Sequence, residues 1–423
     1  MRKRIKQILA GALCFGLAIS DKSALSLGEI NMDKVIVQAA ENVSDITIDG
    51  NNINKENKNG LTYKGFGLLT ANSTSDLLMD YKAEHPEKYV EMLQYLFGGS
   101  KPLMTHVKIE MGNDRNNSTG AESCTMRTED ETANVKRNAG FQLAADAKKI
   151  NPNIKISILR WNTPKWANTT EKQYKWYKNT IMAAYETYGY MVDYINPNRN
   201  EAWSDKTDTE NVKKFAKWIQ EENSDTIKDA KALDLYKKIK FIVSDEAEMI
   251  AKTAVNALYT DEEYKNAVAA IGWHYPYSVA SKSRDGADIL TKDDIIKIAD
   301  EMDKEVWNSE NQAVFSDSAF RPANNTTFKD DSGNVIADSS GLGGTGSALE
   351  MGNYIIKSFV ESRRTHVIYQ PVIGAFYQGG QYSSKELIGA KDPWSGYVRY
   401  DAGTAILSHL SKFAVTGWEN EDN

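Results

Sequence analysis

Short apolar runs alternate along this chain with longer stretches whose apolar residues recur at helical spacing. Near-continuous runs of Ile, Val and Leu are typical of parallel strands that are buried on both faces. Eight candidate strands, several of them near-continuous apolar runs, alternate with helical stretches and predict an α/β fold that closes into a (β/α)₈ barrel; an open doubly wound sheet is the alternative. The predicted strands are 63–69, 104–111, 154–161, 191–196, 239–244, 267–274, 305–309 and 365–376.

The helical stretches carry apolar residues three and four positions apart, as a helix with one buried face requires. In 75–97, for example, Leu78, Tyr81, Tyr89 and Met92 follow this spacing. A segment rich in Asn, Asp, Ser and Gly, 321–346, predicts a long loop after the seventh strand, on the barrel face whose loops shape a substrate cleft. The predicted helices are 75–97, 128–150, 171–188, 210–222, 292–302, 347–363 and 400–413.

Residues 1–40 predict a signal peptide. A basic segment precedes an apolar segment, 8–19, that is too short to span a bilayer, and small residues at 37–40 mark the expected cleavage zone. Of the two cysteines, Cys14 lies in this leader, so Cys124 remains alone and no internal disulfide is expected. These features predict a secreted or cell-surface protein, and the lack of disulfides suits a bacterium.

The remaining chain divides into a predicted N-terminal β-hairpin at 41–62, the barrel at 63–418 and a tail at 419–423. The net charge of −7 argues against nucleic acid and anionic membrane surfaces as partners. No apolar run beyond the leader is long enough to span a membrane, so no integral membrane segment is expected. No His-x-x-x-His spacing is present, so no metal or other cofactor is expected, and we expect a monomer.

Two glutamates follow predicted strands that lie three positions apart around the barrel. Glu201 ends the segment after the fourth strand, and Glu310 ends Trp-Asn-Ser-Glu at the seventh strand. Side chains at the carboxyl ends of barrel strands face the active site. Glycoside cleavage uses two carboxyl groups that flank one bond, about 5 Å apart when configuration is retained. The chain has 58 acidic residues, so a single glutamate at a strand end is weak evidence for a catalytic site. Two glutamates at the ends of the fourth and seventh strands together predict a glycosidase.

Motifs in the same order and spacing resemble glycoside hydrolase family 59, the galactocerebrosidase family, from about Gly65 to Trp418. The motifs are Val107-Lys-Ile-Glu-Met-Gly112, Trp161-Asn-Thr-Pro-Lys-Trp166, Asn200-Glu201, Ser244-Asp245, His274-Tyr-Pro276, Trp307-Asn-Ser-Glu310 and Pro393-Trp-Ser-Gly396. The resemblance implies a retaining β-galactosidase on a (β/α)₈ barrel, similar to galactosylceramidase, that acts by double displacement on a glycolipid or oligosaccharide galactoside.

The resemblance also implies roles for single residues. Glu201 matches the acid/base of the family and Glu310 matches its nucleophile. Residues matching substrate contacts are Asn200, Trp161, Tyr382, Ser118 and His274, although for His274 a supporting role is favoured over direct contact. Glu201 must be protonated in the first step, so we expect its pKa to be raised.

The chain departs from the family pattern in three ways. Gln370 occupies the position of a family tryptophan in the eighth strand. The family continues into a β-sandwich and a lectin-like domain beyond the barrel, and a sugar-contacting arginine there has no counterpart in this chain. The 41–62 hairpin is then interpreted as part of an incomplete sandwich. Two alternatives therefore stay open: another barrel-clan retaining β-glycosidase (glucosylceramidase-like or a galactanase), or a non-catalytic secreted sugar-binding protein.

Overall fold

A computed structural model describes most of the predicted barrel. The described residues are 62–71, 74–115, 121–201, 206–246, 252–274, 297–298, 300–313, 328–329, 335–337, 348–375, 386–390 and 393–415. All of them belong to one unit, Asn57–Asn423. The predicted leader, the hairpin apart from Thr62, the tail, and two predicted site residues, Ser118 and Tyr382, lie outside the described residues.

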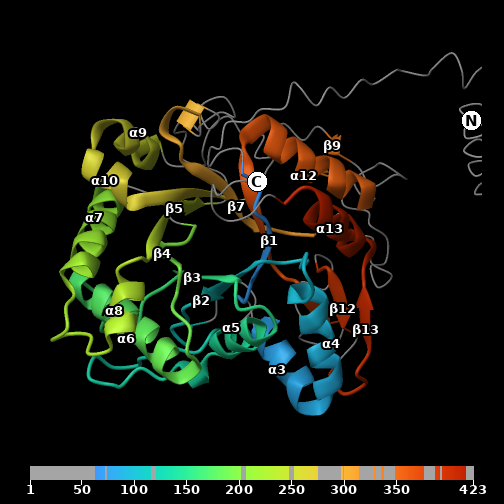
Figure 1. Ribbon diagram of the computed structural model, residues 1–423, viewed down its shortest axis with the longest axis horizontal. Helices are drawn as coiled ribbons and strands as arrows, with labels where there is room; N and C mark the ends of the chain where they lie inside the picture. Colours follow the sequence, from blue (N-terminus) through green and yellow to red (C-terminus); the bar gives the residue numbers. More distant parts are fainter. Residues whose placement is uncertain are drawn as a thin grey trace, which may run out of the picture. The chain divides into compact units, whose positions relative to one another are not determined.

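Eight parallel strands close into a barrel, as predicted (Figure 1). They are β1 (Gly65–Leu69), β2 (His106–Glu110), β3 (Lys155–Arg160), β4 (Tyr194–Arg199), β5 (Lys240–Glu246), β6 (Val268–Trp273), β7 (Glu305–Asn311) and β10 (Arg364–Tyr369). β1 closes the barrel by pairing with β2 on one side and β10 on the other. Because every strand is parallel to its neighbours, all eight carboxyl ends meet at one face.

The predicted eighth strand, 365–376, is too long. β10 ends before Gln370, and Pro371 has no N–H to donate to a sheet. β11 (Ile373–Ala375) instead joins a small separate sheet with β12 (Ile388–Ala390) and β13 (Val398–Tyr400). The predicted loop 321–346 contains two short antiparallel strands, β8 (Phe328–Lys329) and β9 (Val335–Ala337).

Helices surround the strands, and α12 lies beside α13 (Figure 1). They are α3 (Thr74–Glu84), α4 (Pro86–Phe97), α5 (Ala139–Ile150), α6 (Thr170–Tyr188), α7 (Lys206–Glu221), α8 (Ala230–Tyr236), α9 (Lys252–Thr260), α10 (Glu262–Ala267), α12 (Ala348–Ser362) and α13 (Ala402–Phe413). None of the described helices is both long enough and apolar enough to cross a membrane.

Two helix predictions are wrong in extent. The predicted helix 75–97 is two helices, because Pro86 interrupts the chain and serves as the first residue of α4. The predicted helix 128–150 begins only at Ala139, where the side chain of Asn138 accepts a hydrogen bond from the backbone N–H of Gly140. The short helices α8, α9 and α10 were not predicted.

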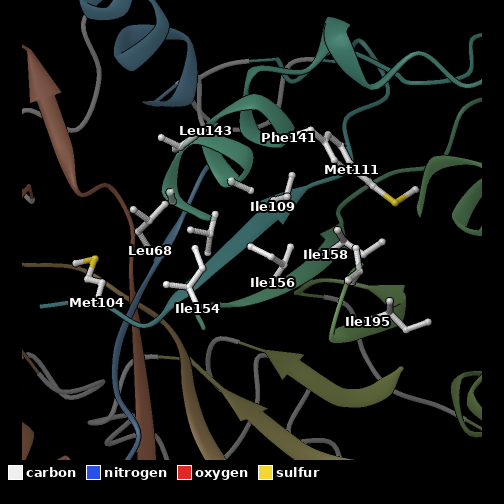
Figure 2. Packing of buried hydrophobic residues seen from close by; sticks show 14 of the residues in the cluster. Leu68, Met104, Ile109, Met111, Phe141, Leu143, Ile154, Ile156, Ile158 and Ile195 are labelled. Carbon is white, nitrogen blue, oxygen red and sulfur yellow. The ribbon is translucent and has the colours of Figure 1, made fainter. Parts of the chain in front are cut away.

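Apolar side chains fill the layer between the strands and the helices. Figure 2 shows Ile109, Ile156 and Ile158 of β2 and β3 near Phe141 and Leu143 of α5. All five are buried, and burying a side chain of this size contributes about 1.5–3 kcal/mol. Because side chains alternate across a strand, the intervening residues point into the barrel. The barrel interior therefore receives a second apolar cluster: Leu69, Ala71, Leu159, Tyr194, Ile242, Ala270, Trp307 and Ile368.

Two buried histidines, His106 and His366, pack against Trp307 of this interior cluster and are linked to each other by a hydrogen bond. His366 Nδ1 lies 2.9 Å from the carbonyl oxygen of Gly65, so this nitrogen must carry the proton. His366 Nε2 then accepts from His106 Nδ1 at 2.9 Å, and His106 Nε2 lies 2.8 Å from Ser157 Oγ. The His366 ring, with one donating and one accepting nitrogen, is therefore neutral. Burial, reinforced by the charge of Lys64, lowers the pKa of His366 to about 3, and burial also lowers the pKa of His106.

Because these two buried rings resist protonation, we expect the free energy of unfolding to fall in acid. The unfolded rings take up protons below about pH 6.5, whereas the folded rings resist protonation, so stability falls as pH decreases through this range. Between pH 6.5 and 5 the expected loss is about 2 kcal/mol for each ring. Urea unfolding at several pH values measures how the free energy of unfolding changes with pH. This pH dependence should be smaller in His366→Gln than in the control His409→Gln, which alters an exposed residue of α13. Equal slopes in the two variants would exclude the buried ring as the cause.

Candidate active site

Polar side chains from four neighbouring strand ends converge at one face of the barrel. Glu201 follows β4, Asp245 lies near the end of β5, His274 follows β6 and Glu310 lies near the end of β7. One side-chain atom from each of Glu201, His274 and Glu310 lies within 4.8 Å of the others. The structure therefore brings together the two glutamates that lie far apart in the sequence.

The two carboxylates flank the ring of His274. His274 Nδ1 lies 3.7 Å from Glu201 Oε1 and 3.8 Å from Glu310 Oε2. The Glu201 side chain is 38% exposed, whereas the Glu310 side chain is 5% exposed. An inverting pair stands about 6.5–9.5 Å apart to admit a water, and a retaining pair stands about 5–5.5 Å apart. One carboxylate oxygen of Glu201 lies within 4.8 Å of one of Glu310, which is closer than the spacing of an inverting pair.

The backbone that presents Glu201 adopts an uncommon conformation. Glu201 has φ 54°, and on β5 Ser244 and Asp245 have φ 67° and 59°. Left-handed backbone at residues other than glycine costs about 1–2 kcal/mol per residue and tends to cluster at functional sites. The Glu201 N–H donates to the carbonyl oxygen of Asp245 at 3.0 Å, which ties the two segments together.

Asn200 and Trp161 both lie beside Glu201. The Asn200 amide nitrogen donates to Asp245 Oδ2 at 3.0 Å, and its oxygen accepts from Trp161 Nε1 at 3.1 Å. The same indole N–H lies 3.1 Å from Glu201 Oε2. Of the predicted site residues, Asn200, Glu201, Trp161, His274 and Glu310 are thus close together, and Gln370 is buried directly after β10.

A buried Lys–Asp pair supports His274, and neither of its residues was among the predicted site residues. Lys108 Nζ lies 2.8 Å from both carboxylate oxygens of Asp245 and 3.1 Å from the carbonyl oxygen of Ser309. Asp245 Oδ1 in turn lies 2.8 Å from His274 Nε2. The available signal was the lysine itself, because Lys108 interrupts an apolar strand sequence between Val107 and Ile109.

Gly272 on β6 allows β5 and β7 to pack closely against β6 on its two sides. A Cβ at Gly272 would lie 2.6 Å from Ser309 Oγ and 2.9 Å from the Cα of Asp245. Both distances are shorter than a side chain tolerates, so only glycine fits between β5 and β7 at this level.

The charges of the cluster determine its protonation. Burial disfavours a charged His274 ring, but the charge of Glu310 and the contacts with Asp245 and Glu201 outweigh burial and raise the pKa of His274 to about 9. Burial also opposes the charge of Asp245, yet the Lys108 and His274 cations hold its pKa well below the ordinary value.

The expectation of a raised pKa for Glu201 does not hold in this structure. Burial raises the pKa of Glu201, but the nearby His274 cation and the Trp161 N–H outweigh burial and place it below the ordinary value. The site thus pairs a carboxylate with an imidazolium.

Among the described residues, Glu201, His274 and Glu310 are also the one group of His, Cys, Asp and Glu side chains that converge closely enough for a metal ion. A protonated imidazole has donors on both nitrogens and offers no lone pair to a cation. With the pKa of His274 raised to about 9, the ring would have to release a proton at neutral pH before it could bind a metal ion.

Sequence comparison relates the chain to glycosidases. The sequence profile of glycosyl hydrolase family 59 matches residues 63–412. Galactocerebrosidase from Danio rerio is 25% identical over 370 residues, covering 85% of this chain and 46% of the relative. A putative galactocerebrosidase from Caenorhabditis elegans is 32% identical over 157 residues, covering 36% of this chain and 22% of the relative. The chain spans less than half the length of these relatives.

Solved structures support the barrel. SrfJ from Salmonella typhimurium is 13% identical with a TM-score of 0.57, over 83% of this chain and 75% of that chain. The endo-β1,6-glucanase BT3312 is 14% identical with a TM-score of 0.56, over 86% of this chain and 79% of that chain. At these identities the likeness concerns the fold.

Proposed function

Because this chain belongs to glycosyl hydrolase family 59, we propose that it is a retaining β-galactosidase with Glu310 as nucleophile and Glu201 as acid/base. The observation that carries the proposal is the convergence of the two glutamates, whose side-chain atoms lie within 4.8 Å. Galactose as the sugar is supported by relatives named galactocerebrosidase. A glycolipid or oligosaccharide aglycone is consistent with that relationship.

In the first step, Glu310 attacks the anomeric carbon while Glu201 protonates the departing oxygen, and a glycosyl-enzyme ester forms. In the second step, Glu201 takes a proton from a water that displaces Glu310, so the configuration is retained. The difference in burial suits these roles, because the nucleophile is shielded while Glu201 is open to the leaving group and to water. Asn200 and Trp161 are proposed as sugar contacts because they lie beside Glu201.

The proposal extends to the setting in which the enzyme acts. The basic and apolar segments of residues 1–40 support export, and we propose a monomer that works outside the cell on galactosides.

Glu201→Gln tests the acid role through the leaving group. The variant keeps the size of the side chain but cannot donate the acid proton, so aryl galactosides with poor leaving groups should slow by about 10²-fold or more. Nitrophenyl galactosides, whose leaving groups need little protonation, should lose much less in the step that forms the glycosyl-enzyme. Rates for a series of aryl galactosides measure the difference.

A matched control is Glu221→Gln on the exposed surface of α7, which should leave the series unchanged. Equal losses on good and poor leaving groups in Glu201→Gln would contradict the acid role. A parallel panel of nitrophenyl β-galactoside, β-glucoside and β-xyloside tests the sugar, and preference for a sugar other than galactose would overturn that part of the proposal.

A further inference from the structure

The proposed acid, Glu201, does not itself hold the proton that the first step consumes. The cation of His274 lies 3.7 Å away and the N–H of Trp161 lies 3.1 Å away, and both stabilise a carboxylate. The charges of Glu310, Asp245 and Glu201 raise the pKa of the His274 ring between the two glutamates to about 9, so this ring is the group that favours a proton at neutral pH.

The position of His274 suits a residue that stores a proton. Its ring is fully buried, Nε2 is fixed by Asp245, and Nδ1 faces Glu201 on one side and Glu310 on the other. Behind Asp245, Lys108 holds both carboxylate oxygens. Within the described part of the chain, charged groups that face the ring come from the ends of β4, β5 and β7, and β2 supplies the lysine behind them.

We propose that the acid proton of the first step rests on His274 and passes from its Nδ1 to Glu201, with Asp245 and Lys108 as positioning residues. This inference rests on the proposed function. Before the transfer the pair is a Glu201 carboxylate with a His274 imidazolium, and after it both side chains are neutral. The total charge of the pair is the same in both states, so moving the proton creates no new net charge in the buried site.

The transfer balances over the catalytic cycle. The 3.7 Å gap between His274 Nδ1 and Glu201 Oε1 closes to hydrogen-bond distance, and the proton then leaves His274 Nδ1 for Glu201 Oε1. Glu201 gives a proton to the glycosidic oxygen as the carbon–oxygen bond breaks and the bond to Glu310 forms. The Glu310 ester has no charge, so the strongest attraction that holds the proton on His274 disappears during this step. In the second step the proton from the attacking water returns through Glu201 to His274.

The pH dependence of kcat/KM follows from this arrangement. The pair keeps its proton until pH rises through the His274 pKa of about 9, and activity is lost above that value. A glutamic acid acting alone would lose its proton near its ordinary pKa of about 4.3. An alkaline limb near pH 9 therefore distinguishes the two cases.

The test combines a titration that needs no substrate with a rate profile. The protein has five histidines, and NMR of ¹³C-labelled imidazole carbons follows each ring with pH. His85→Gln and His409→Gln identify the signals of the two rings outside the barrel. Of the three buried rings, only that of His274 is expected to titrate above pH 7, and its midpoint should lie near 9 and fall in Asp245→Asn.

The rate profile then separates this inference from the proposed function. With an aryl galactoside that has a poor leaving group, the alkaline limb of kcat/KM should move from about pH 9 to below 7 in His274→Gln. A His274 ring that titrates below 7, or an unchanged limb in His274→Gln, would overturn the inference while glycosidase activity remains. If no nitrophenyl glycoside is hydrolysed but the ring titrates near 9, the proposed function fails and the assignment of the resting proton stands.

Discussion

Replacing Glu310 with glycine is expected to reduce hydrolysis of a nitrophenyl galactoside by about 10³-fold or more, because the covalent step loses its nucleophile. Sodium azide should restore part of the activity, since the anion fits the space left by the carboxylate and attacks the same face of the sugar. The product of rescue should be an α-glycosyl azide, because a single displacement inverts the anomeric centre. NMR of the product measures both the rate and the configuration.

The control for this variant is Glu221→Gln, which should retain wild-type rates without and with azide. Undiminished activity in Glu310→Gly would exclude Glu310 as the nucleophile. A β-glycosyl azide product would likewise contradict the proposed geometry.

Lys108→Met is expected to lower the free energy of unfolding by about 3–5 kcal/mol, because it leaves the Asp245 carboxylate buried without its main cation. The side chains of Lys108 and Asp245 are 1% and 0% exposed, so solvent cannot replace the lost partner. Chemical denaturation at pH 7 measures the change. The variant should also lose activity, since Asp245 fixes the ring of His274.

The matched control is Lys238→Met, just after α8, where Lys238 and Asp234 form an exposed pair at 2.7 Å. Exposed pairs are worth less than about 1 kcal/mol, so this variant should be nearly as stable as wild type. The double variant that combines Lys108→Met with Asp245→Asn removes both buried charges and should cost less than the sum of the two single variants. A Lys108→Met protein within about 1 kcal/mol of wild type would show that Asp245 does not depend on this lysine.

The barrel could be predicted because its signal is local and repeated. β6 (Val-Ala-Ala-Ile-Gly-Trp) appears in the sequence as a short apolar run, as a strand covered on both faces does, whereas β2 alternates apolar Val107 and Ile109 with polar residues. The ends of elements were harder to predict. The apolar residues of β10 resume at Val372, just after Gln370 and Pro371, so the sequence suggests one strand where the structure has β10 and β11. Short helices such as α8 have too few turns to show a period.

The candidate site could be predicted in part for a related reason. Glu201 and Glu310 directly follow or end strands, so the topology alone places them at the same face. A lysine inside a predicted barrel strand indicates a buried charge, but Lys108 and Asp245 lie 137 positions apart and nothing local in the sequence identifies one as the partner of the other. The predicted direction of the Glu201 pKa shift was wrong for the same reason, since the shift depends on the 3.7 Å approach of His274, which follows a strand two places away in the barrel.

The most direct test of the proposed pair is covalent trapping with 2-deoxy-2-fluoro-β-galactosyl fluoride followed by peptide mapping. The fluorine slows both steps, and the good leaving group lets the glycosyl-enzyme accumulate. We expect one fluorogalactosyl group per chain, attached to Glu310, and no labelling in Glu310→Gly. A label on any other residue, or steady turnover of galactosides by an enzyme that is never labelled, would contradict Glu310 as the nucleophile.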